Sequence, residues 1–137
     1  MMITTDGAAS PNPGPAAIGA VIKDEGGNII TTISHSIGYA TNNQAEYRAI
    51  IIALEMAIRL GAEQVELYSD SQLVVRQVSG HYRVKATALL PLYQKIKELK
   101  NQLKTFTINH ISGETNEAHN LANDALGKSK LAKFHSY

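Results

Sequence analysis

Hydrophobic residues follow two periods along the chain. Short runs that alternate between apolar and polar residues predict strands, and longer runs with a 3.6-residue period predict helices. The predicted strands cover Met2–Thr5, Ala17–Lys23, Ile29–Ile37, Gln64–Ser69 and Thr105–Ile111. The predicted helices cover Asn43–Leu60, Ser71–Val78, Thr87–Lys104 and Asn116–Leu126. The predicted apolar face of the first helix consists of Ala45, Ala49, Ile52, Ala53, Met56, Ala57 and Leu60. That of the long helix consists of Leu89, Leu92, Tyr93, Ile96, Leu99 and Leu103, and the core stripe of the last helix consists of Ala118, Leu121, Ala122 and Ala125. The predicted order of elements is therefore βββαβααβα.

This order of elements predicts a mixed sheet. The first strands are separated by the proline-rich loop 11–15 and by the turn 25–28, so we expect an antiparallel meander. Each later strand follows a helix, which favours parallel crossover connections. We therefore expect an α/β (mixed α+β) fold: a five-stranded mixed sheet flanked by helices, in a single domain over residues 1–137.

Composition narrows the function classes only a little. The 44% hydrophobic and 18% charged residues are typical of a soluble globular protein, and the absence of cysteine excludes thiol catalysis and thiolate metal sites. We see no signal-peptide pattern and no apolar run long enough for a bilayer, so we expect a cytoplasmic protein without a membrane partner. The net charge of +1 neither demands nor excludes a nucleic-acid partner, although Arg76, His81, Arg83 and Lys85 form a local basic cluster.

Three acidic residues occupy positions where a charge is costly. Asp6 follows the first strand, Asp70 ends the strand Gln64–Ser69, and Glu46 lies beside the apolar face of a predicted helix. A buried carboxylate is unfavourable unless something uses its charge. In a sheet of this kind, sites gather at the C-terminal ends of parallel strands, where Asp6 and Asp70 are expected. A hard divalent cation with oxygen ligands would explain all three acids at once.

Several short segments resemble the motifs of type 1 ribonuclease H. They occur in the order and spacing of that family, and the resemblance covers nearly the whole chain. The segments are Asp6–Ala8, Asn12–Ala16, Asn42–Glu46, Tyr68–Gln72 and Asn116–Ala118. The chain is most similar to the compact branch of the family that lacks a basic protrusion before the long helix.

The resemblance implies a metal-dependent endonuclease. Such an enzyme hydrolyses the RNA strand of an RNA/DNA hybrid by a two-metal-ion mechanism and leaves 5′-phosphate and 3′-hydroxyl ends. It implies Mg²⁺ or Mn²⁺ as cofactor, with two ions per site when substrate is bound, and a monomer without an obligate protein partner. Asp6, Glu46 and Asp70 match the first three of the family's four acids. The implied substrate-binding residues are Asn12, Thr41, Asn43, Gln44, Ser71 and Gln72.

The fourth acidic position departs from the family pattern. Counting forward from Asn116 places Asn120 there, whereas counting back from Leu121 places His119 there, and neither residue is an acid. Mg²⁺ prefers oxygen to imidazole nitrogen, so we expect Asn120 to be the fourth catalytic residue and metal ligand. His119 is the alternative, because the helical period places it at the flank of the core stripe and Asn120 nearly opposite that stripe.

Two other function classes compete with the nuclease. The first is a nucleic-acid-binding module of the same fold with weak or no catalysis, because the fourth acid is missing. The presence of Asp6, Glu46 and Asp70 argues against it, since a binding module does not need them. The second is a nuclease or transposase-like enzyme of the same fold with another substrate, which the close match of Asn42–Glu46 disfavours.

Overall fold

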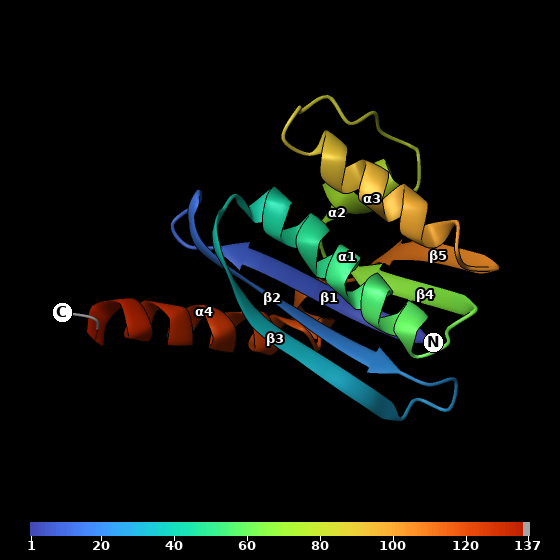
Figure 1. Ribbon diagram of the computed structural model, residues 1–137, viewed down its shortest axis with the longest axis horizontal. Helices are drawn as coiled ribbons and strands as arrows, with labels where there is room; N and C mark the ends of the chain where they lie inside the picture. The colour runs from blue at the N-terminus through green and yellow to red at the C-terminus, as the bar shows by residue number, and fades with distance from the viewer. Residues whose placement is uncertain (136–137) are drawn as a thin grey trace.

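A five-stranded sheet forms the centre of the molecule (Figure 1). The computed structural model describes the backbone of residues 1–135 and the side-chain surroundings of residues 1–127. The strands lie in the order β3-β2-β1-β4-β5 across the sheet. Their bounds are β1 Met2–Ala9, β2 Gly14–Lys23, β3 Ile29–Ala40, β4 Gln64–Ser69 and β5 Thr105–His110.

The pairing of the strands confirms the mixed sheet. Strand β2 runs antiparallel to both β1 and β3, which makes the expected meander. Strand β4 runs parallel to β1 and to β5. The chain therefore leaves the meander by helical crossovers, as the alternation of later strands and helices predicts.

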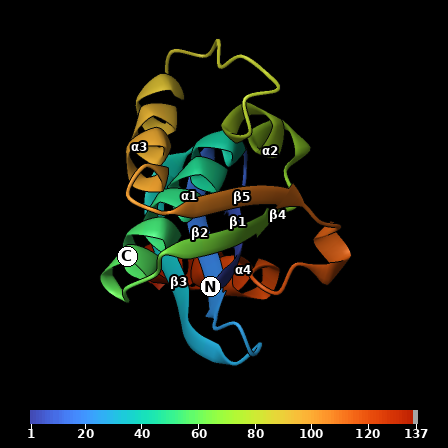
Figure 2. The same cartoon turned by 90° about the vertical axis from the view of Figure 1, so that its right-hand side faces the viewer.

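Helices cover both faces of this sheet. Their bounds are α1 Asn42–Arg59, α2 Gln72–Val78, α3 Leu90–Lys100 and α4 His119–His135, with a short 3₁₀ helix, η1, at Gly113–Thr115. Figure 2 shows α1, α2 and α3 on one face and α4 on the other. The predicted order of helices and strands is confirmed, and η1 is an addition to it. Within residues 1–135, no helix is both long and apolar enough to cross a membrane.

Two element boundaries near the candidate acids differ from the sequence prediction. Strand β1 continues past Asp6 to Ala9, because β2 stays paired with it over that stretch. Helix α4 begins at His119 rather than at Asn116. The side chain of Asn116 accepts a hydrogen bond from the N–H of Ala118 (2.8 Å), a local bond that competes with helix formation.

The third helix is shorter than predicted. Helix α3 runs from Leu90 to Lys100 instead of Thr87–Lys104, and turns flank it on both sides. Pro91 lies in its first turn, where its missing N–H costs no intrahelical bond. Most of the predicted apolar face is nevertheless buried: Leu89, Ile96, Leu99 and Leu103 are at most 9% exposed, and Leu92 and Tyr93 are partly buried.

The main core lies between α1, the sheet and α3. Because α1 contacts both β1 and α3, its buried face is wider than one 3.6-period stripe. Tyr47, Ile50 and Leu54 are fully buried, although the sequence pattern does not place them on the apolar face. Leu60, which the pattern does place there, is 43% exposed. The stripe prediction is therefore wrong at these positions. It misses the three buried residues because it assumes a helix covered on one side only, whereas Leu60 is the C-cap residue and lies beyond the last residue of α1.

Close packing of α4 on the sheet depends on Gly19 of β2. A Cβ atom at this position would overlap the carbonyl oxygen of Ala118 and lie 2.7 Å from the backbone nitrogen of Ala122. Both obstacles are backbone atoms, so no side-chain rotation relieves the overlap. Gly19 therefore determines how closely the start of α4 approaches the sheet.

Gly19→Ala should lower the stability of the protein by about 1–3 kcal/mol or more, because α4 has to move away from β2. The measurement is the Tm by circular dichroism. Gly127→Ala is the matched control, since no atom lies within 4 Å of the added Cβ in this exposed helical position. That control should leave the Tm unchanged or raise it slightly. Equal Tm values for the two variants would contradict the close packing at Gly19.

Candidate active site

Three carboxylates from different elements converge at one edge of the sheet. Asp6 lies on β1, directly after the last residue that pairs with β4, Thr5 opposite Ser69. Asp70 follows the end of β4, and Glu46 lies near the start of α1. Because β1 and β4 are parallel neighbours, the side chains that follow their paired stretch meet at the same edge.

Hydrogen bonds hold Glu46 between β1 and β4. The backbone N–H of Gly7 donates to its Oε1 (2.6 Å), and the hydroxyl of Ser69 donates to its Oε2 (3.2 Å). A Cβ atom on Gly7 would overlap the carbonyl group of Ala45 and lie 2.6 Å from the nitrogen of Glu46. A glycine after Asp6 is therefore required for α1 to bring Glu46 to the sheet.

Burial and mutual repulsion raise the pKa values of two of these acids. Glu46 is 6% exposed, and burial raises its pKa well above the ordinary value. The negative charge of Asp6 raises it further, while the N–H of Gly7 acts in the opposite direction. Burial also raises the pKa of Asp70, and the charge of Asp6 adds to that shift. The three carboxylates therefore make an electrostatically unfavourable group without a cation.

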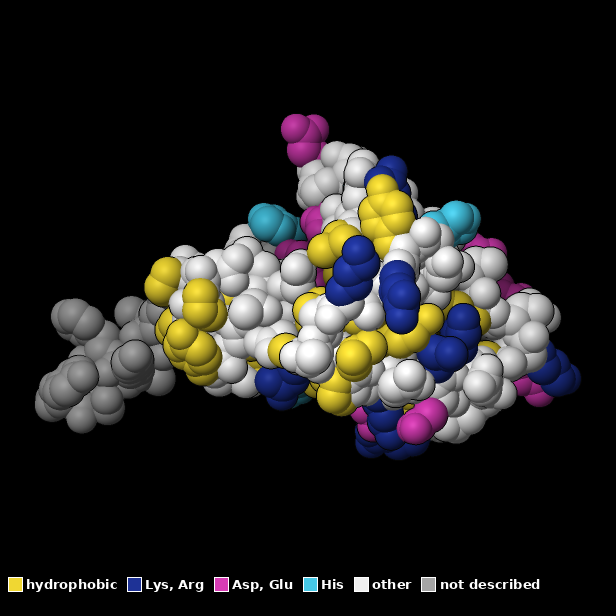
Figure 3. All heavy atoms as spheres, turned by 90° about the horizontal axis from the view of Figure 1, so that it is seen from above, with side chains coloured by type: hydrophobic (Ala, Val, Ile, Leu, Met, Phe, Trp, Pro, Cys, Tyr) yellow, Lys and Arg dark blue, Asp and Glu magenta, His cyan; other side chains and the backbone are white. Residues whose placement is uncertain are grey.

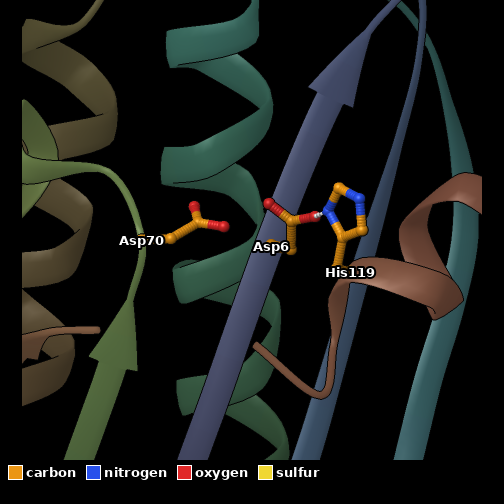
Figure 4. Close-up of side chains that lie close together, drawn as sticks. All are labelled: Asp6, Asp70 and His119. Atoms are coloured by element: carbon orange, nitrogen blue, oxygen red, sulfur yellow. Dashed lines mark hydrogen bonds and ion pairs between the residues drawn. The ribbon is translucent and has the colours of Figure 1, made fainter. Parts of the chain in front are cut away.

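His119 contacts this group from the other side of Asp6. Its Nδ1 lies 3.0 Å from Oδ2 of Asp6, whose side chain is 6% exposed, while the imidazole itself is 52% exposed. Figure 4 shows Asp70 and His119 on opposite sides of Asp6. Ligand atoms of these three residues all lie within 4.8 Å of one another. Two carboxylates and an imidazole at this spacing form a donor set for a divalent cation.

Two asparagines position His119. The side-chain amide of Asn116 is buried and donates to the backbone carbonyl of Thr5 (2.9 Å), which ties the start of α4 to β1. Nδ2 of Asn123 lies 3.1 Å from Nε2 of His119. Sequence reasoning did not identify Asn123. Its signal is the spacing of four residues from His119, which places both side chains on one helix face.

Asn120, the fourth ligand expected from the sequence, occupies the second position of α4. Its side chain is exposed, and it lines a shallow pocket together with His119, Asn116 and η1. Its role as a metal ligand stays a prediction. The structure places His119, the alternative candidate, in contact with Asp6.

Three of the expected substrate-binding residues serve as local caps near the start of α1. Asn12 accepts a hydrogen bond from the N–H of Asn42 (3.0 Å). Thr41 and Gln44 form a capping box: the N–H of Gln44 donates to the Thr41 hydroxyl (3.1 Å), and the N–H of Thr41 donates to the Gln44 side chain (2.9 Å). Asn43 is exposed in the first turn.

The remaining expected substrate-binding residues lie at the start of α2. Ser71 caps this helix by accepting a hydrogen bond from the N–H of Val74 (3.3 Å). Gln72 is exposed in the first turn. Both residues follow Asp70 directly, so the two helix starts flank the acids. Contacts of any of these side chains with a nucleic acid stay predictions.

Comparison with curated proteins finds relatives over most of the chain. Ribonuclease HI of Halobacterium salinarum is 43% identical over 122 residues, which is 88% of this chain and 61% of that protein. The chain thus spans about three fifths of this relative, and 35% of the length of a related bifunctional protein of Mycobacterium tuberculosis.

Solved structures agree with this fold over most of the chain. The N-terminal RNase H domain of Rv2228c from Mycobacterium tuberculosis has a TM-score of 0.93 at 37% identity, and 96% of each chain is covered. LC11-RNase H1, solved in complex with an RNA/DNA hybrid, has a TM-score of 0.89 at 42% identity. That comparison covers 94% of this chain and 98% of the other.

A family model described as reverse transcriptase-like matches residues 4–125. The matched region contains most of β1, all of β2 to β5, all three acids and His119. The fold of this region is that of solved RNase H structures. The chain therefore belongs to the type 1 ribonuclease H family.

Proposed function

We propose that the chain is a metal-dependent endonuclease that hydrolyses the RNA strand of RNA/DNA hybrids. The observation that carries this proposal is the convergence of Asp6, Glu46 and Asp70 at one sheet edge of a ribonuclease H fold. Relatives named ribonuclease H, and LC11-RNase H1 bound to a hybrid, support the substrate class. That the enzyme acts as a cytoplasmic monomer without an obligate protein partner stays a prediction.

The donor set fits a hard divalent cation. Carboxylate oxygens are the ligands that Mg²⁺ and Mn²⁺ prefer, and the raised pKa values of Glu46 and Asp70 indicate negative charge without enough compensation. Asp6, Glu46 and Asp70 would hold the metal. A pair of bound ions would stabilise the phosphate as Lewis acids and would lower the pKa of the attacking water. Hydrolysis of the RNA strand in this way would leave 5′-phosphate and 3′-hydroxyl ends.

The protein residues supply a rigid arrangement of charges. The bonds from Gly7 and Ser69 orient both oxygens of Glu46 before any ligand arrives. Such preorganisation lowers the reorganisation needed during reaction. Asp6 is in contact with His119 and acts electrostatically on both Glu46 and Asp70, so it is the central acid of the group.

The helix starts flanking the acids are the proposed contact surface for the hybrid. Exposed amides of Asn43 and Gln72 suit hydrogen bonds to 2′-hydroxyl groups and base edges in the minor groove, which distinguish RNA from DNA. Asn12, Thr41, Gln44 and Ser71 support these starts as caps and have further hydrogen-bonding capacity for substrate.

Basic side chains offer a second set of contacts for the hybrid. Viewed from above, several Lys and Arg side chains gather among hydrophobic ones on the face that carries α1, α2 and α3 (Figure 3). Arg76 lies 5.1 Å from the centre of the Tyr82 ring and donates to its hydroxyl (2.6 Å), so its position is fixed. We propose that Arg76, Arg83 and Lys85 contact phosphates.

A binding module without catalysis is the second candidate function. The observation that favours it is the absence of a fourth acid, since His119 and Asn120 occupy the candidate positions. A module that only binds would gain nothing from a group of repelling acids near a polyanion. Metal-dependent cleavage therefore separates the two candidates.

Asp6→Asn and Asp70→Asn should each reduce hybrid cleavage about a thousandfold or more, because each removes a charge that holds the metal. The measurement is single-turnover cleavage of a hybrid labelled on its RNA strand, with Mg²⁺, Mn²⁺ or EDTA. Asp124→Asn, an exposed carboxylate elsewhere on α4, is the matched control and should cleave normally. Substantial cleavage in EDTA would refute the proposal.

The same site should make the metal-free protein less stable as pH rises. Glu46 has a folded-state pKa above its ordinary value of 4.5, so its contribution to stability is fully present below that pH. The contribution is lost as pH rises through the folded-state pKa, and the raised pKa of Asp70 acts in the same direction. The measurement is Tm against pH in EDTA.

Asp70→Asn should raise the Tm in EDTA near neutral pH, although it abolishes cleavage, because the amide carries no charge to repel Asp6. Added Mg²⁺ should remove most of the difference by stabilising the wild-type protein. A lower Tm for this variant in EDTA would show that the carboxylates do not repel one another as described.

We expect His119 to take the role of the family's fourth active-site acid, because this side chain contacts Asp6. His119→Ala should then reduce cleavage more than Asn120→Ala across a Mg²⁺ titration. The sequence-based expectation predicts the opposite order, together with improved cleavage by Asn120→Asp at low Mg²⁺. Cleavage rates of these variants at several Mg²⁺ concentrations decide between the two assignments.

A further inference from the structure

We propose that His119 is a metal ligand through Nδ1, and that its imidazole shifts the metal preference of this site from Mg²⁺ toward Mn²⁺. The proposal rests on the metal site of the proposed function and adds the identity of a nitrogen ligand and its consequence. It comes from the contact between His119 and Asp6 and from the position of Asn123 behind the imidazole.

The distance between the two ligand atoms fits a shared cation. An octahedral ion with bonds of about 2.1 Å places neighbouring ligand atoms about 3.0 Å apart and opposite ones about 4.2 Å apart. Nδ1 of His119 and Oδ2 of Asp6 are separated by 3.0 Å. With Asp70 included, all three ligand atoms lie within 4.8 Å of one another, a span close to that between opposite ligands of such an ion.

Asn123 can form a hydrogen bond with the imidazole of His119 both without metal and with metal bound. When the amide N–H donates a hydrogen bond to Nε2, the ring proton resides on Nδ1, which donates a hydrogen bond to Asp6. When the amide is turned over, its oxygen instead accepts a hydrogen bond from Nε2–H, and the lone pair of Nδ1 is free for a metal. A histidine that binds a metal characteristically donates its other N–H to such an acceptor. Asn123 is therefore a positioning residue.

Ligand chemistry connects this arrangement to metal preference. Replacing a fourth carboxylate by a neutral imidazole leaves one negative charge fewer, which weakens binding of every divalent ion. Imidazole nitrogen is a good ligand for transition metals and a poor one for Mg²⁺. The bond to nitrogen therefore offsets the loss of affinity for Mn²⁺, but it does not offset the loss of affinity for Mg²⁺.

The exposed side of the imidazole leaves room for this role. His119 is 52% exposed, so the ring turns without displacing the core. Asn116 meanwhile fixes the backbone at the start of α4 by its bond to Thr5. A rotating ring on a fixed backbone suits a ligand that changes partner when metal arrives.

The test is metal binding by the full chain without substrate, measured by calorimetry for Mg²⁺ and Mn²⁺. The wild-type protein should bind Mn²⁺ at least about tenfold more tightly than Mg²⁺. His119→Asp should tighten Mg²⁺ binding and reduce that ratio severalfold, because it restores a charged oxygen ligand. His35→Ala, which removes an exposed histidine on β3, is the matched control and should leave both affinities unchanged.

Electron spin echo spectroscopy of bound Mn²⁺ gives a direct second readout. Coupling to an imidazole nitrogen should appear in the wild-type protein and in His35→Ala, and it should be lost in His119→Asp. Asn123→Leu should keep the coupling but weaken Mn²⁺ binding about tenfold, since the ring loses the acceptor that orients it.

The outcomes separate this inference from the proposed function. Absence of nitrogen coupling, with the same metal ratio in the wild-type protein and His119→Asp, would overturn the inference even if hybrid cleavage is efficient. Tighter binding of both metals by His119→Ala would also overturn it and would identify the histidine as a competing cation beside Asp6. Nitrogen-coupled Mn²⁺ without hybrid cleavage would instead overturn the proposed function and leave His119 as a ligand.

Discussion

Repulsion among three carboxylates in a buried position is the constraint on which the rest of this structure depends. Asp6 and Glu46 are almost completely buried, and Asp70 lies close enough for the charge of Asp6 to raise its pKa. The protein offsets this only in part, through the N–H of Gly7, the hydroxyl of Ser69 and the imidazole of His119. The main core must therefore be stable enough to hold a group that disfavours folding until a cation binds.

Backbone packing brings these charges together. The parallel pairing of β1 with β4 places Asp6 and Asp70 at one edge, but Glu46 arrives from a helix that crosses above the sheet. Gly7 permits that helix to approach β1, and Gly19 permits α4 to approach β2 from the opposite face. Two missing side chains thus determine the separation of the acids and of the histidine, although neither glycine carries any chemistry.

Strand patterns and the turn residues were sufficient to predict the sheet and the order of elements. Strand β4 alternates between buried and exposed residues, β2 is a short continuous apolar run, and characteristic turn residues separate the first strands. The same reasoning failed for the buried face of α1, since Tyr47, Ile50 and Leu54 are buried by contacts that depend on tertiary packing against both the sheet and α3. It also placed the start of α4 too early, because the competing bond between Asn116 and Ala118 has no periodic signal.

The three acids could be predicted because a carboxylate at a strand end or on an apolar helix face is conspicuous in a sequence. The fourth position could not, since a shift of one residue makes Asn120 and His119 equally acceptable in a count along the chain. The start of α4 adds an observation that the count lacks, because His119 lies in contact with Asp6 there (Figure 4). The assignment of the fourth position stays a prediction. Asn123 could not be predicted for the same reason. Its proposed role is to orient His119, so it can be recognised only after a role has been assigned to that histidine.

Replacing an acid by histidine changes the balance between the metal-free and metal-bound states. A fourth carboxylate would add repulsion to a group whose pKa values are already raised, whereas the imidazole of His119 lies within hydrogen-bonding distance of Asp6 and adds no negative charge. With the proposed His119 at the fourth position, the metal-free protein avoids that repulsion, and the metal-bound protein has one unit of negative charge fewer. A nitrogen ligand recovers part of that loss only for ions that accept nitrogen, so greater stability without metal is coupled to a narrower choice of metal.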